Sequence, residues 1–204
     1  MPPRYDWAPL QAALSAEQRK LIEDYLDQLL DYNGKVNLTA PTDPQNLLLR
    51  HVADGLAAVK VLKEHLSAPA PKILDLGCGG GFIGMTIKIA WPEASVTLLE
   101  SLKRKYEFLN LAVMRSRLKG LRVLQGRAAG QPLLGEVGFD AVVERALAPL
   151  PQALRLALPL TAPGGYFLAY QSARPQQPLP GLIKSYPYRL PLETRDRHLV
   201  LFKK

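Results

Sequence analysis

Short apolar runs and stretches of mixed apolar and polar residues follow one another along the chain in a regular order. The apolar runs predict five buried strands, one beginning at Lys72 and the others at residues 95–100, 122–125, 139–144 and 166–170. Between strands, residues 101–117 and 150–160 carry apolar side chains at helical spacing. Strands that alternate with helices in this way predict right-handed βαβ crossovers, and therefore an α/β protein with a mostly parallel sheet covered on both faces.

A helix is predicted near the start of the chain. Ser15 and Gln18 have the spacing of a capping box, and apolar residues recur on one helical face over about residues 16–32. We expect Asn33 and Gly34 to end this helix and residues 36–39 to be extended.

A second helix is expected to begin at Asp43 and Pro44, because proline fits the first helical position, and to continue into the Leu62 region. The segment 67–71, rich in alanine and proline, follows it. We therefore divide the chain into an N-terminal helical extension, residues 1–70, and a ligand-binding domain, residues 71–204.

The first strand ends in a glycine-rich turn. Asp75 stands two residues before the first of three alternate glycines, Gly77, Gly79 and Gly81, in the pattern D-x-G-x-G-x-G. A chain that reverses here needs positive φ angles, and a ligand close to backbone amides tolerates no Cβ. The pattern is similar to motif I of S-adenosylmethionine (SAM) methyltransferases. Residues 79–84 also match the dinucleotide fingerprint G-x-G-x-x-G, so a NAD site and a turn without a ligand stay open.

The second strand ends in an acid, Glu100, which is suited to accept hydrogen bonds from ribose hydroxyls. NAD-binding enzymes place an acid there too. Glu100 therefore indicates a nucleoside ligand without distinguishing SAM from NAD.

Two further strands are predicted at residues 185–190 and 198–202, joined by a short polar connection. So short a connection favours an antiparallel pair. Five parallel strands that end in such a hairpin are typical of the seven-stranded methyltransferase architecture, whereas a NAD-binding Rossmann domain more often ends in a further parallel unit.

A series of motifs over nearly the whole chain resembles the RsmG (GidB) family. The motifs are residues 31–39, Asp43-Pro44, 50–54, 77–84, 100–105, Arg145-Ala146 and 197–200. Members of that family transfer a methyl group from SAM to N7 of a guanine in small-subunit (16S) ribosomal RNA. The resemblance implies a class I SAM-methyltransferase (Rossmann-like) fold, with a seven-stranded, mostly parallel sheet, an antiparallel last strand and an N-terminal helical extension.

The resemblance also implies a cofactor site. Gly77 and Phe82 fall where the family's turn contacts SAM, and Glu100 falls where its acid meets the ribose. Arg145 matches an arginine at the mouth of the site, where it would position substrate or SAM. The cofactor-binding residues expected on this basis are Asp75, Gly77, Gly79, Gly81, Phe82, Glu100, Ser101, Ala128, Ala129 and Arg145.

The formal net charge of +8 and the pI near 9.6 favour a polyanionic partner, since phosphate neutralisation releases counterions. A basic but merely solvated surface is the alternative. The residues expected to contact RNA are Lys103, Arg104, Lys105, Arg127 and Arg197.

Five residues depart from the family pattern. Ala129 stands where an acid is common, Ile83 replaces proline, Glu144 replaces serine, and Tyr170-Gln171 replaces Lys-Gly. The loss of a lysine and the gain of a glutamate beside Arg145 make this edge less positive, which disfavours RNA phosphate locally. Either other basic residues recognise the RNA or the chain is a diverged member with another substrate.

Guanine N7 has a free lone pair and no proton, so methyl transfer to it needs no general base. We therefore expect no catalytic residue of that kind and expect catalysis by alignment of the reacting atoms. The alternatives are a diverged SAM methyltransferase with another substrate and a SAM-binding ribosome-assembly factor without transfer activity.

The remaining features favour a cytoplasmic protein, which we expect to act as a monomer. Cys78 is the only cysteine, and the three histidines are scattered, so neither a disulfide nor a metal site is expected. No secretory pattern or membrane span is expected. His51 and Asp54 lie one helical turn apart and are expected either to pair at the surface or to anchor the extension against the sheet.

Overall fold

The computed structural model describes residues 4–10, 14–40, 42–128, 137–177 and 179–204. Within these residues a single sheet of seven strands has the order β3-β2-β1-β4-β5-β7-β6. The strands are β1 (Lys72–Leu76), β2 (Ser95–Glu100), β3 (Leu121–Gln125), β4 (Phe139–Glu144), β5 (Thr161–Gln171), β6 (Leu182–Tyr188) and β7 (Arg197–Lys203). β1 to β5 pair in parallel, and β7 is antiparallel to both β5 and β6. The predicted fold class and closing hairpin are confirmed.

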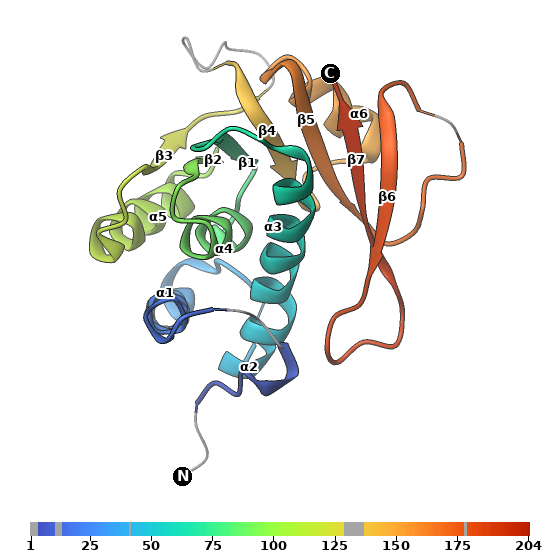
Figure 1. Cartoon of the computed structure of the whole chain (residues 1–204). Coiled ribbons are helices and arrows are strands. Elements are labelled where there is room, and N and C mark those ends of the chain that lie inside the picture. Colours follow the sequence, from blue (N-terminus) through green and yellow to red (C-terminus); the bar gives the residue numbers. More distant parts are fainter. Residues whose placement is uncertain (1–3, 11–13, 41, 129–136, 178) are drawn as a thin grey trace.

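Helices cover both faces of this sheet. The helices are α1 (Ala16–Val36), α2 (Pro44–Asn46), α3 (Ala53–His65), α4 (Phe82–Ala90), α5 (Lys103–Ser116) and α6 (Leu150–Ala157), with a short 3₁₀ turn, η1, at Ala8–Leu10. Figure 1 shows α1, α3, α4 and α5 on one face and α6 on the other. Alternate residues of β4 explain this, because Ala141 and Val143 pack in the cluster on the α4 side and Val142 packs in the cluster on the α6 side.

The first helix is longer than the sequence predicted. α1 continues through Asn33 and Gly34 and ends at Val36, where Asn37 takes a left-handed conformation and its amide bonds to the carbonyl of Asn33. A glycine inside a helix costs only about 1 kcal/mol, which burial of Ile22, Leu26 and other side chains outweighs. The predicted break at Asn33-Gly34 is therefore wrong, while the capping box at Ser15 is confirmed.

The second predicted helix is divided into three parts. Asp43 caps α2 as expected, but the six residues Leu47–Val52 form a π-helical segment, η2, before α3 begins at Ala53. A π-helical turn shifts the phase of the side chains that follow it. Here it sets the directions of His51 and of Asp54, two positions that the candidate site uses.

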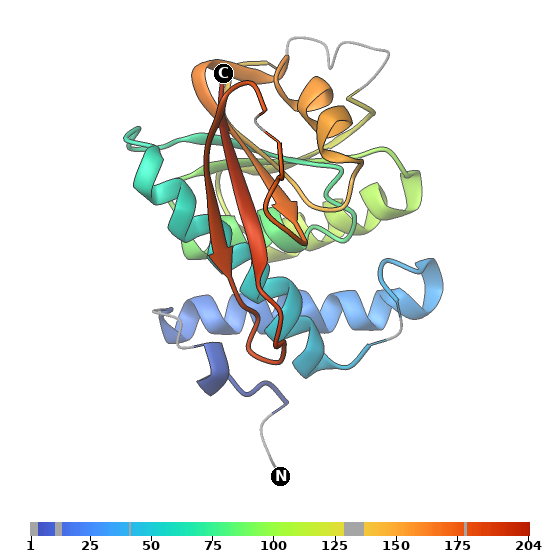
Figure 2. The same ribbon diagram turned by 90° about the vertical axis from the view of Figure 1, so that its right-hand side faces the viewer.

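The helices of the extension pack on the rest of the molecule. One buried cluster contains Leu26 from α1, Val52 from η2, Leu62 from α3 and residues of α4, α5 and the sheet. The hairpin of β6 and β7 descends beside α3 toward the N-terminal helices (Figures 1 and 2). The division at residues 70 and 71 stays a prediction. Because the extension shares this buried cluster, its helices pack as part of the same hydrophobic core as the sheet.

Candidate functional site

The glycine turn after β1 has the predicted left-handed geometry. Gly77, Gly79 and Gly81 have φ angles of 69°, 60° and 88°. A Cβ on Gly77 would come within 2.6 Å of the Leu147 side chain, whereas one on Gly79 would have only the Lys105 ammonium within 4 Å, at 3.9 Å. The turn therefore exposes its backbone at Gly79 toward open space, as a cradle for a ligand requires.

Two carboxylates at the strand ends hold this turn. Asp75 accepts a 2.8 Å hydrogen bond from the amide of Gly84. Glu100 accepts a 2.9 Å bond from the amide of Gly79 and a 2.7 Å bond from the amide of Leu102. Burial raises the pKa of the Asp75 carboxyl to about 7, although the Gly84 amide opposes the rise. Asp75 therefore ties the first turn of α4 to β1, as a structural cap does.

A cavity of about 470 Å³ opens beside the turn. It is lined by Leu38, Thr39, His51, Asp75, Gly77, Cys78, Gly79, Gly80, Phe82, Ile83, Lys105, Arg145, Ala146 and Arg197. It lies at the carboxyl ends of the parallel strands, where ligands bind in open α/β sheets. We call it the cofactor-side cavity.

Aromatic groups form one wall of the cofactor-side cavity. The ring of His51 stacks on Phe82 with centroids 4.2 Å apart, and the Arg145 guanidinium lies 5.6 Å from the centroid of the same ring. Burial, followed by the charge of Arg145, lowers the pKa of His51 to about 3, so this imidazole is neutral near pH 7. Tyr25 packs edge-on against Phe82 and donates a 2.6 Å hydrogen bond to the carbonyl of Gly80.

Asp54 is the partner of Arg145, and the sequence did not identify it as a site residue. Its carboxylate oxygen Oδ2 lies 2.7 Å from Nη1 of Arg145 and 3.5 Å from Nη1 of Arg197. Oδ1 accepts a 2.6 Å bond from Tyr188, and the backbone carbonyl accepts a 2.7 Å bond from Tyr170. Of the two expectations for Asp54, anchorage of the extension against the sheet is the correct one. The signal that the sequence offered for Asp54 was its position within the motif at residues 50–54.

A second cavity of about 540 Å³ lies on the other side of the two arginines, and we call it the hairpin-side cavity. It shares Arg145, Ala146 and Arg197 with the cofactor-side cavity. Its other lining residues are Tyr170, Gln171, Ser172, Tyr188, Glu193, Arg195 and Asp196. The arginines that Asp54 pairs therefore form a wall common to both cavities.

Glu144 and Arg145 are neighbours in the chain but have different partners in the structure. Glu144, the last residue of β4, accepts a 3.1 Å bond from the amide of Leu147, whereas Arg145, the next residue, pairs with Asp54. Glu144 is 1% exposed, and burial raises its pKa to about 7. Its Oε1 has no hydrogen-bond partner among the described residues.

The other residues expected at the site are divided by the fold. Lys105 and Arg197 line the cofactor-side cavity, and Gly81 caps α4 beside it. Glu100 is also outside the lining and reaches the cavity only through the Gly79 amide. The other positions outside the lining are Ser101, Lys103, Arg104, Arg127 and Ala128, of which the first four are exposed and Ala128 packs on the α6 side. Nζ of Lys103 lies 3.8 Å from Oε1 of Glu107, so this lysine forms an ion pair on α5. Ala129 lies outside the described residues.

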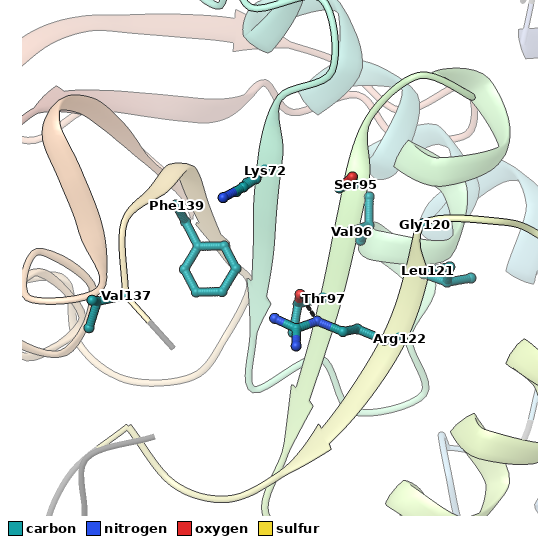
Figure 3. A pocket seen from close by; sticks show the side chains of 9 residues that line it. All are labelled: Lys72, Ser95, Val96, Thr97, Gly120, Leu121, Arg122, Val137 and Phe139. Atoms are coloured by element: carbon teal, nitrogen blue, oxygen red, sulfur yellow. Dashed lines mark hydrogen bonds between the residues drawn. The ribbon is translucent and has the colours of Figure 1, made fainter. Parts of the chain in front are cut away.

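A cavity of about 520 Å³ at the opposite ends of the strands is a weaker candidate. Figure 3 shows it between Lys72, Phe139 and Arg122. Nε of Arg122 donates a 3.1 Å hydrogen bond to Oγ1 of Thr97. Lys72 and Phe139 begin their strands, so this cavity lies at the amino ends, away from the glycine turn. Ligands of parallel sheets bind at the carboxyl ends, which favours the cofactor-side cavity.

Comparison with known proteins agrees with this geometry. Residues 18–186 match the family model GidB, described as rRNA small subunit methyltransferase G. The chain belongs to the GidB family. It is 36% identical to ribosomal RNA small subunit methyltransferase G of Desulfitobacterium hafniense (strain Y51), over 82% of this chain and 69% of that protein. It is 39% identical to the protein of the same name from Moorella thermoacetica, over 78% of this chain and 65% of that one.

The GidB chain thus spans about two thirds of the length of these relatives. A solved SAM-dependent methyltransferase from Aquifex aeolicus matches with a TM-score of 0.55 at 17% identity, over 79% of this chain and 93% of that chain. This likeness shows the fold.

The described part of the chain offers neither a metal site nor a membrane-spanning helix. Among these residues, no three His, Cys, Asp or Glu side chains are grouped so that they could hold a metal ion. Within the same residues, no helix has the length and hydropathy needed to cross a membrane.

Proposed function

We propose that this GidB-family protein transfers a methyl group from SAM to N7 of a guanine in small-subunit (16S) ribosomal RNA. The observation that carries the proposal is the cofactor-side cavity, in which a positive-φ glycine turn faces Arg145 and Arg197. The relatives named as ribosomal RNA small subunit methyltransferases supply the substrate class. We further propose that the protein acts in the cytoplasm, as a monomer and without a metal ion.

The residues present fit SAM. Gly79 leaves room for a ligand against the backbone, and the Glu100 carboxylate sits at the end of the neighbouring strand. Gly77, Gly79, Phe82 and Glu100 would hold the cofactor, which supplies a methyl group on a sulfonium. The carboxylate of Glu100 would accept hydrogen bonds from ribose hydroxyls while it continues to hold the Gly79 amide.

The chain's own part in the reaction is to position the base. N7 carries a free lone pair, so no side chain has to remove a proton. Arg145 has five N–H donors, one of which is used by Asp54, and the others can meet the guanine carbonyl or a phosphate. Holding the reacting atoms in line can supply roughly 7 to 11 kcal/mol of the barrier. Phe82 and His51 would help to exclude water from that side.

The test is transfer of tritium from labelled SAM to in vitro transcribed 16S ribosomal RNA, followed by digestion and mass analysis of the labelled nucleoside. The proposal expects N7-methylguanosine. Label in another nucleoside would overturn the position of transfer. SAM binding without transfer, to either bare RNA or small subunits that lack the modification, would favour an assembly factor.

A matched pair of variants tests the cofactor site. Glu100→Gln removes the charge from the carboxylate that meets Gly79, and we expect SAM to bind about 10- to 100-fold more weakly, as for loss of a hydrogen bond to a charged group. Glu107→Gln changes an exposed carboxylate on α5 that pairs with Lys103, and it should bind SAM as the wild type does. Equal affinities in the two variants, or saturation of the wild type by NAD instead of SAM, would refute the assignment.

A further inference from the structure

One carboxylate gathers polar side chains from three strands of the sheet. Asp54 is 1% exposed and receives Arg145 from the end of β4, Arg197 from the start of β7 and Tyr188 from the end of β6. Its own backbone carbonyl is bonded by Tyr170 of β5. An interior carboxylate is tolerated only when it is paired and hydrogen-bonded, and these contacts meet that condition.

Asp54 belongs to the helical extension, not to the sheet. It follows the π-helical segment η2 by two positions, on the first turn of α3. The extension therefore determines where two arginines of the sheet are held. Without the carboxylate, the guanidinium groups of Arg145 and Arg197 would face each other as like charges in a partly buried place.

The two arginines differ in how many of their donors are already used. Arg197 uses Nε and Nη2 on Glu193 at 2.8 and 2.7 Å and Nη1 on Asp54, so its position is fixed on both sides. Arg145 is bonded only through Nη1 among the described residues, rests over the ring of Phe82, and has a side chain 21% exposed. It thus presents a rigid fork of N–H groups between the cofactor-side and hairpin-side cavities.

We propose that Asp54 is a positioning residue for the RNA substrate, which acts by holding Arg145, with Arg197 beside it, in the wall between the two cavities. The fork of Arg145 then meets the guanine carbonyl or the phosphate of the same nucleotide in a preset orientation. This inference rests on the proposed function and adds to it a residue of the extension that shapes substrate binding without a contact to the substrate.

A double-mutant cycle between Asp54 and Arg145 tests the inference. Asp54→Asn, Arg145→Ala and the double variant are compared in KM for a 16S ribosomal RNA transcript, in kcat and in the dissociation constant for SAM. We expect Asp54→Asn to raise KM about tenfold or more, as expected for loss of a charge-assisted contact, with SAM affinity changed less than about twofold. In the Arg145→Ala background the same change should have no further effect on KM, because the group through which Asp54 acts is gone.

Two outcomes would overturn the inference. If the effects of the two substitutions on KM multiply, Asp54 does not act through Arg145. If Asp54→Asn has the wild-type KM, no positioning is needed. Asp24→Asn, which removes a carboxylate from an exposed ion pair with Lys20 on α1, serves as the control and should leave every constant unchanged.

A further variant covers the case in which Asp54→Asn does not fold. Arg145→Lys keeps a positive charge for Asp54 but has no planar fork, and we expect it to raise KM for RNA about tenfold while SAM binding persists. A wild-type KM in this variant would also overturn the inference. A wild-type protein that labels no RNA would instead refute the proposed function, so the two failures are distinguishable.

Discussion

The carboxylate of Asp75 and the amide of Gly84 are joined by a 2.8 Å hydrogen bond across the glycine turn. The bond links the end of β1 to the first turn of α4, whose amides have no partner within the helix. It gives the turn a fixed shape in a chain segment where three residues have positive φ. The geometry of the cofactor-side cavity depends on this link.

The link predicts a difference between two substitutions. Asp75→Asn keeps an oxygen that can accept from Gly84, whereas Asp75→Ala leaves the buried amide unpaired. We expect Asp75→Ala to be less stable than Asp75→Asn by about 1–3 kcal/mol, the usual cost of an unsatisfied buried donor. Urea unfolding of both variants at one pH measures it, and equal midpoints and slopes would contradict the role given to the bond.

Two glycine-to-alanine changes should have opposite signs. A Cβ on Gly84 would lie 2.2 Å from Leu98 and 3.0 Å from Asp75, so Gly84→Ala forces neighbouring atoms apart in a packed core. Overpacking of this kind costs roughly 1–3 kcal/mol. Gly34 lies within α1, where a Cβ would have no described neighbour within 4 Å, and Gly34→Ala should stabilise by about 0.5–1 kcal/mol. Thermal unfolding of the two variants measures both changes in stability. If both substitutions stabilise the protein, the side chains around Gly84 can move to accommodate a methyl group.

Glu144 gives the stability of the protein a defined pH dependence. Burial raises its pKa from 4.5 to about 7, so between these values the folded state holds a proton that the unfolded state has released. Stability therefore falls as the pH rises through this window and is constant above it as far as Glu144 is concerned. Asp75, whose pKa is also raised to about 7, contributes with the same sign.

Replacement of Glu144 by glutamine should remove its share of that loss. We expect Glu144→Gln to match the wild type near pH 4 and to be more stable at pH 8, by up to roughly 3 kcal/mol, the free energy that corresponds to the pKa difference. Urea unfolding at the two pH values measures this. Destabilisation at pH 8 would mean that the ionised carboxylate is needed.

Lys105 should contribute to RNA binding through its charge. It lines the cofactor-side cavity, whereas Lys20 on α1 is paired with Asp24 at the surface. We expect Lys105→Ala to weaken RNA binding and to reduce the logarithmic salt slope by about 0.7, the value for one phosphate contact on a single strand. Lys20→Ala should leave the slope unchanged. Titration of a 16S ribosomal RNA transcript over a range of salt concentrations compares them, and equal slopes would remove Lys105 from the interface.

Local patterns in the sequence were sufficient for the order of strands and helices, for the positive-φ glycine turn and for the acids at the ends of β1 and β2. These features depend on neighbouring residues, because side-chain periodicity and backbone sterics act over a few positions. The end of α1 was wrongly placed for the same reason, since Asn33 and Gly34 favour a break locally but the packing of α1 overrides it.

Only the tertiary structure decided how distant residues share the site. Asp54 and Arg145 are separated by 91 positions in the chain, and nothing local indicates that α3 brings a carboxylate to the end of β4. Glu144 and Arg145 are adjacent, yet Glu144 accepts a bond from the Leu147 amide and Arg145 pairs with Asp54, so neighbours in the sequence have different partners in space. Ion pairs in the interior follow from packing and from the need to compensate buried charge, and these act through space and not along the chain.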